Sequence, residues 1–116
     1  MKPKKVVITA AGLGTRLLPM TKELPKEMLP IFVESGGKLV LKPLLQALFE
    51  QLYQFGFREF CFIVGRGKRS IEDHFTPDWS YVERLRAKGK EDEARELEAF
   101  YKSVEDSVIL LSLIHI

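Results

Sequence analysis

The chain has 116 residues, which limits it to one domain or a part of one. With 18 Lys and Arg residues against 16 Asp and Glu, its formal net charge is +2, so the charge balance indicates neither a nucleic-acid partner nor a membrane partner. No apolar stretch is long enough for a signal peptide or a membrane span. The single cysteine, Cys61, excludes an internal disulfide and lies in an apolar run. We therefore expect a cytoplasmic protein with Cys61 as a buried core thiol.

The first predicted element is a strand over residues 6–10, an apolar run with little alternation that is typical of a strand buried on both faces. A glycine-rich turn follows it directly, with the sequence Ala11-Gly12-Leu13-Gly14-Thr15. Small residues let backbone N–H groups approach a phosphate. The cations Arg16, Lys22 and Lys26 follow in the same long loop. The segment therefore predicts a polyphosphate site at the end of a buried strand.

Two common phosphate motifs do not match this loop. The P-loop needs Gly-x-x-x-x-Gly-Lys-[Ser/Thr], which the chain lacks. The dinucleotide motif Gly-x-Gly-x-x-Gly begins at Gly12 but meets Leu17 where the third glycine should stand. Pro19 also prevents a helix from starting cleanly. The loop is thus expected to supply its own cations, and a plain glycine turn stays open as an alternative.

The next segments predict a small hairpin and a crossover helix. Residues 31–33 and 38–41 are short apolar runs around a glycine turn. Pro43 suits the first position of a helix that runs up to Gly56. An apolar face predicts that this helix packs on the sheet, and it consists of Leu44, Leu48, Leu52 and Phe55, flanked by Leu45 and Phe49. A second buried strand is expected over residues 60–64. Strand, helix and strand in this order predict a right-handed parallel unit.

The remaining chain predicts three helices and a strand. Ser70 is expected to cap a short helix that runs through Phe75. Two polar helices follow, over residues 79–87 and 91–104, with sparse apolar positions at helical spacing. They are expected to lie over a sheet edge or against a partner subunit, which leaves a homo-oligomer open. Residues 107–116 are β-branched and apolar, and they predict a third strand.

Two longer patterns resemble the sugar-phosphate nucleotidyltransferases. The first is Gly-x-Gly-Thr-Arg-x-x-Pro-x-Thr-x-x-x-Pro-Lys-x-x-Leu-Pro, which ends at Pro30. The second is Lys-Arg-Ser-Ile-Glu-Asp-His-Phe, at residues 68–75. Glu27 directly after Lys26 is similar to the UTP–glucose-1-phosphate uridylyltransferase branch. The hairpin departs from the commonest family pattern and looks like an insertion.

The resemblance covers nearly the whole chain and implies a fold. That fold is α/β and Rossmann-like, with three α/β/α layers and a mainly parallel sheet. Residues 1–116 would be the incomplete N-terminal part of a single nucleotidyltransferase domain. We expect the last five residues, 112–116, to be a tail that does not belong to the natural protein.

The resemblance also implies a reaction, in which UTP and glucose 1-phosphate give UDP-glucose and pyrophosphate. It assigns catalytic roles to Arg16 and Lys26. It assigns the nucleotide phosphates to the backbone amides of residues 12–16, among them Gly12, Leu13, Gly14 and Thr15. It assigns the uracil base to Glu27 together with Ala11 and Gly12. Mg²⁺ is implied as cofactor, with its ligands expected beyond position 116 and none within this chain.

Three alternatives remain open at this point. The first is a glucose-1-phosphate thymidylyltransferase or another nucleotide-sugar pyrophosphorylase. The second is a non-catalytic module that binds a nucleotide without transfer. The third is a purely structural α/β fragment, because a parallel sheet without its remaining strands exposes an apolar edge. We expect the 116 residues alone to have little or no activity.

Overall fold

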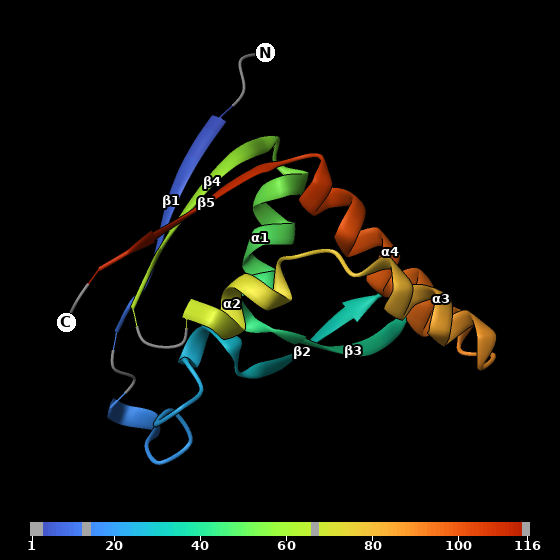
Figure 1. The fold of residues 1–116 in the computed structure, drawn as a ribbon, viewed down its shortest axis with the longest axis horizontal. Helices are drawn as coiled ribbons and strands as arrows, with labels where there is room; N and C mark the ends of the chain where they lie inside the picture. Colours follow the sequence, from blue (N-terminus) through green and yellow to red (C-terminus); the bar gives the residue numbers. More distant parts are fainter. Residues whose placement is uncertain (1–3, 13–14, 66–67, 115–116) are drawn as a thin grey trace.

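The structure is a computed structural model that describes residues 4–12, 15–65 and 68–114. Its main sheet has three strands, β1 (Lys4–Ala10), β4 (Phe57–Val64) and β5 (Val108–Leu113), in the order β1-β4-β5. Both neighbouring pairs are parallel. The α/β class and the parallel sheet are therefore confirmed. Figure 1 shows the three strands side by side at one flank of the molecule.

The α-helices of the described residues lie on one side of this sheet (Figure 1). They are α1 (Leu44–Gln54), α2 (Lys68–His74), α3 (Trp79–Ala87) and α4 (Glu91–Glu105). The other face is uncovered in the described residues, because Val7 and Leu110 are each 62% exposed. The expectation that strand 6–10 is buried on both faces is therefore wrong for this chain.

Cys61 lies on the uncovered face. It pairs in register with Val7 on one side and Leu110 on the other, while its neighbours Phe60 and Phe62 are buried on the helical side. Successive side chains of a strand point to opposite faces, so Cys61 faces away from the core. It is half-buried. The expectation of a buried core thiol is thus wrong. It assumed that helices cover both faces of the strand that contains Cys61, whereas the helices of the described residues cover only one.

The core is built from aromatic rings between the sheet and the helices. Phe49 of α1 lies 4.6 Å from Phe60 of β4, centroid to centroid. Phe75 lies 5.0 Å from Phe62 and 5.3 Å from Phe100 of α4, both at steep interplanar angles. Edge-to-face pairs of this kind stabilise beyond the area that they bury. These rings hold α1, α4 and the sheet together.

Helix α1 ends as predicted, since Gly56 follows it with φ 103. Pro43 is its N-cap instead of its first helical residue. The buried face is centred on Leu45 and Phe49, whereas Leu44, Leu48 and Phe55 are exposed. The buried face is therefore rotated from the predicted one toward Leu45 and Phe49, the residues expected at its flank.

The other helices begin and end close to their predicted bounds, with one correction. Helix α2 starts at Lys68, so Ser70 lies inside it and the expected cap is wrong. Helix α4 buries Ala94 and Phe100 and contacts α1 and the edge strand β5. Ser112 and Leu113 continue β5 in register with β4. Whether residues 112–116 are native stays a prediction, as does a homo-oligomer.

The predicted hairpin is present as β2 (Pro30–Ser35) and β3 (Lys38–Pro43), an antiparallel pair. Gly36 and Gly37 form its turn with φ 58 and 83, a conformation that glycine adopts without strain. The base of the hairpin is closed where Pro30 faces Pro43. Among the described helices, none has the length and apolar character needed to cross a membrane.

Candidate functional site

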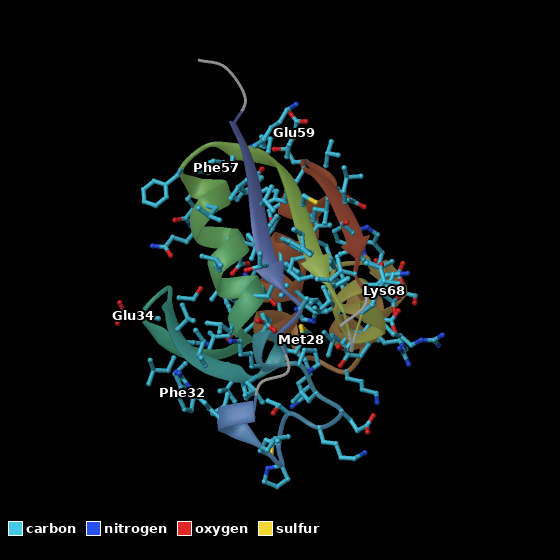
Figure 2. All side chains as sticks on the ribbon, turned by 90° about the vertical axis from the view of Figure 1, so that its left-hand side faces the viewer. Met28, Phe32, Glu34, Phe57, Glu59 and Lys68 are labelled. Atoms are coloured by element: carbon cyan, nitrogen blue, oxygen red, sulfur yellow. The ribbon has the colours of Figure 1, made fainter. Side chains whose placement is uncertain are left out.

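Lys26 and Glu27, directly before Met28, lie beyond the carboxyl ends of β1 and β4. Figure 2 shows Met28 and Lys68 at that end of the sheet, with Phe57 and Glu59 at the opposite end. Strand β1 leads at this end into the long loop, and β4 leads into α2. Open α/β sheets bind their ligands at the carboxyl ends of the strands.

In its described part, the long loop forms defined turns, in line with the expected ordered loop. It contains two 3-10 turns, η1 (Thr15–Leu17) and η2 (Lys26–Met28). Within η2 the N–H of Met28 donates to the carbonyl of Pro25 at 2.9 Å. Pro25 is buried, and Met28 packs against the hydrophobic core. The core therefore holds η2 in place and with it the two residues before Met28.

Lys26 and Glu27 are neighbours with opposite environments. Lys26 is exposed, whereas Glu27 is only 8% exposed. Its Oε1 atom is buried and has no hydrogen-bond partner among the described residues. A buried acceptor without a donor is unfavourable by about 1–3 kcal/mol, and more when it is charged. Such an atom is expected where a ligand supplies the missing donor.

The turn after β1 is only partly described. Ala11 is buried and Gly12 is exposed, whereas Leu13 and Gly14 lie outside the described residues and Thr15 is described only as the first residue of η1. A Cβ built on Gly12 would meet no atom within 4 Å. The fold itself thus leaves open space beside Gly12. That space admits the close approach of an external group to the backbone.

Several cations at this end have no acidic partner in the described part of the chain. Arg16, Lys26 and Arg69 are exposed and take part in none of the ion pairs among those residues. Lys22 differs, because it pairs with Glu23 at 2.5 Å. The sequence analysis grouped Lys22 with the other cations of the loop. The ion pair with Glu23 partly neutralises the charge that Lys22 could offer to a ligand. An anionic ligand is the natural partner for the other three.

The described residues contain no group of three or more His, Cys, Asp or Glu side chains that could hold a metal ion. His74 is half-buried, lies beside the core rings of Phe75 and Phe100, and interacts with Gln46. These contacts give His74 a structural role. The sequence did not single out Gln46, although a glutamine beside the buried face of α1 is a signal that could have been used.

A family comparison decides the class. The model of the nucleotidyl transferase family matches residues 5–104. The chain belongs to the nucleotidyl transferase family. A relative from Bacillus subtilis, named UTP–glucose-1-phosphate uridylyltransferase YngB, is 46% identical over 97 residues, which are 84% of this chain and 30% of that protein. A uridylyltransferase of Streptococcus pyogenes is 47% identical over 89 residues, 77% of this chain and 27% of its own length.

Solved structures of the same class have the same fold. An apo UDP-glucose pyrophosphorylase is 33% identical with a TM-score of 0.77, and the match covers 98% of this chain and 37% of that one. A UTP-bound enzyme from Acinetobacter baumannii is 26% identical with a TM-score of 0.78, and the match covers 99% of this chain and 37% of that one. The chain thus spans about a third of the length of these relatives.

Proposed function

We propose that the protein carrying this chain is a UTP–glucose-1-phosphate uridylyltransferase. The single observation in the structure that carries this proposal is the Lys26–Glu27 pair on η2. An exposed cation stands there beside a buried carboxylate whose Oε1 lacks a donor. The similarity to uridylyltransferases at 46% and 47% identity supports the choice of reaction.

The reaction joins two polyanions. An oxygen of the sugar phosphate attacks the α-phosphorus of UTP, its bond to phosphorus forms, and the bond to pyrophosphate breaks in line. The nucleophile is already an anion, so neither a covalent intermediate nor a general base is required. Repulsion between unit charges at ~4 Å is about 4 kcal/mol near a protein surface. Positioned cations are therefore the main tool that the protein can offer.

We assign these cationic roles to Arg16 and Lys26. Arg16 neutralises charge on the leaving pyrophosphate, and Lys26 contacts the α-phosphate and the sugar phosphate. The amides of residues 12–16, among them Leu13, Gly14 and Thr15, bind the nucleotide phosphates. The anchored position of η2 supports the role of Lys26, because Met28 fixes the turn on the core. For Arg16 the support is its exposed charge at the same end of the sheet.

Glu27 is proposed to read the base together with Ala11 and Gly12. The pairing edge of uracil offers one N–H donor between two carbonyl acceptors. The Oε1 atom of Glu27 can accept from that donor, and the backbone amides of Ala11 and Gly12 can donate to a carbonyl. Cytosine presents an acceptor at the same ring nitrogen, so it would leave Glu27 unsatisfied.

Mg²⁺ remains an expectation for residues outside this chain. Among the described residues there is no group of three or more His, Cys, Asp or Glu side chains for a metal ion, and we assign Mg²⁺ no ligand in this chain. The roles of Arg16, Lys26 and Glu27 therefore stand on their own charges and hydrogen bonds.

The test is a pyrophosphate-release assay on the full-length protein with glucose 1-phosphate and each nucleoside triphosphate in turn. We expect UTP to be the preferred substrate. A clear preference for dTTP would replace the proposal with a thymidylyltransferase. Binding of UTP without release of pyrophosphate would replace it with a non-catalytic nucleotide-binding module.

A further inference from the structure

A continuous chain of partly buried polar contacts runs between the hairpin and α2. Lys42 Nζ of β3 lies 2.7 Å from Glu50 Oε1 of α1, and Gln46 Nε2 lies 3.4 Å from Glu50 Oε2. His74 Nε2 of α2 lies 2.7 Å from Gln46 Oε1. Gln46 is buried, and the Lys42 and Glu50 side chains are only 12% and 22% exposed. We name this set the polar chain.

Chemistry fixes the direction of every bond in the polar chain. An ionised carboxylate only accepts, so Lys42 and Gln46 both donate to Glu50. The Gln46 carbonyl then faces His74, which must donate through Nε2. Burial lowers the pKa of His74 and so favours the neutral ring with a single proton. Each side chain of the polar chain therefore has one donor or acceptor role in each hydrogen bond.

The first end of the polar chain is tied to η2. Lys42 stands directly before Pro43, which faces Pro30 at the base of the hairpin. The N–H of Leu44 donates to the carbonyl of Leu29 at 2.9 Å, and Leu29 is the residue that ends η2. The base of the hairpin thus connects Lys42 to the turn that carries Lys26 and Glu27.

The second end of the polar chain is tied to α2. His74 is the last residue of this helix, and Lys68 is its first. Lys68 lies with Met28 at the same end of the sheet (Figure 2). The polar chain therefore joins the two segments, η2 and α2, that flank the proposed nucleotide site.

We propose that the polar chain fixes η2 and α2 relative to each other, and that Gln46 at its centre is a positioning residue for nucleotide binding. This inference rests on the proposed function, because that function makes UTP the common ligand of η2 and α2. Apolar contacts alone would stabilise several nearby arrangements, whereas directed hydrogen bonds select one. A displacement of about 1 Å in such a site is enough to lower turnover or affinity strongly.

The first experiment replaces Gln46 by leucine in the full-length protein and measures kcat and KM for UTP. Gln46→Leu keeps the size of the side chain and removes both contacts. We expect the KM for UTP to rise by roughly threefold to tenfold, with kcat changed much less. The matched control is Gln51→Leu on the exposed side of the same helix, which should leave KM unchanged. An unchanged KM in Gln46→Leu, even with a lower melting temperature, would overturn the proposal.

A second pair of variants separates the hydrogen bond from the packing of the ring. His74→Gln retains an amide donor that can reach the Gln46 carbonyl, whereas His74→Leu has none. We expect a KM close to the wild-type value in His74→Gln and a raised KM in His74→Leu. Equal values in the two variants would show that the donor does not matter, and the proposal would then fail.

Amide hydrogen exchange without any ligand tests the coupling independently of activity. In Gln46→Leu, segments 22–29 and 68–76 should exchange faster together, and Gln51→Leu should change neither. Faster exchange in only one segment, or in none, contradicts the proposal. Failure of the wild-type protein to use UTP would overturn the proposed function alone, because the exchange result does not depend on turnover.

Discussion

Basic side chains form ion pairs more often in the helical layer and the hairpin than at the carboxyl end of the main sheet. In the helical layer and the hairpin, several basic side chains have acidic partners. Arg86 lies 2.8 Å from Glu98 and 3.2 Å from Glu91, and Lys38 lies 2.8 Å from Asp92. These contacts raise the pKa values of Lys38 and Arg86 and lower those of Asp92 and Glu98, chiefly through the side-chain hydrogen bonds.

At the carboxyl end of the sheet, Lys22 pairs with Glu23, but other basic side chains in the described part of the chain lack such a partner. Arg16 and Lys26 form no ion pair with any residue in the described part of the chain, and Glu27 nearby retains an unsatisfied oxygen. The difference indicates a division of tasks. Substitutions in the helical layer should change the free energy of unfolding, and substitutions at the carboxyl end should change kinetics. Each prediction below tests one side of this division.

The largest effect is expected in the aromatic core. Phe49→Ala should lower the free energy of unfolding by about 3–5 kcal/mol, because the cavity would lie among Phe60, Phe75 and Phe100. Denaturant unfolding of the full-length protein measures it. Phe55→Ala is the control on the same helix, where the ring is 65% exposed and the loss should stay below about 1 kcal/mol. Similar losses in both variants would contradict the assigned core.

Lys26→Ala should have the largest effect on the reaction. Turnover should fall by at least about a hundredfold, equivalent to about 2.7 kcal/mol in the barrier, because the cation facing the phosphates is lost. The melting temperature should stay unchanged, since Lys26 is exposed. Lys38→Ala removes a lysine whose ion pair is on the surface, and it should leave turnover intact. Normal kinetics in Lys26→Ala would remove this residue from the mechanism.

Glu27→Gln should change selectivity more than rate. The ratio of kcat/KM for UTP to that for CTP should fall by about tenfold, or about 1.4 kcal/mol, because the amide can donate to cytosine where the carboxylate cannot. Competition assays with both nucleotides measure the ratio directly. An unchanged ratio would assign the reading of the base to residues outside this chain.

The sequence predicted the elements well because each depends on local signals. Glycines such as Gly56 mark helix ends, and the apolar runs mark the three strands. The uncovered face of the sheet was missed because an apolar run alone does not tell which of its faces is covered. The strands that contain Val7 and Cys61 are apolar on both faces, as is typical of a strand covered on both sides. The described residues nevertheless cover only the opposite face, on which the helices pack.

The candidate site was predicted in part, for a similar reason. The residues Lys26 and Glu27 were recognised from their motif, but their opposite burial depends on Met28 packing into the core. The pairing of Lys22 with Glu23 and the contact between Gln46 and His74 involve side-chain geometry that no periodic pattern encodes.

A smaller effect is expected at the N-cap of α3. The Asp78 carboxylate accepts from the N–H of Tyr81 at 3.2 Å and from the Ser80 hydroxyl at 2.7 Å. Asp78→Ala should lower the free energy of unfolding by about 1 kcal/mol. Glu83→Ala, on an exposed position of the same helix, is the control and should change it little. Turnover should be unaffected in both, since α3 is remote from η2.

The pH dependence of His74 should be the smallest effect. Burial among Phe75, Phe100 and Gln46 lowers the pKa of His74 below its ordinary value of about 6.5. The unfolded chain therefore binds the proton first as the pH falls, so the stability contribution is complete above about pH 6.5 and decreases toward the lower folded pKa. Unfolding measured from pH 7.5 to 5 should show this decrease in the wild type and a weaker one in His74→Gln. Identical slopes would mean that His74 binds its proton as easily in the folded protein as in the unfolded chain.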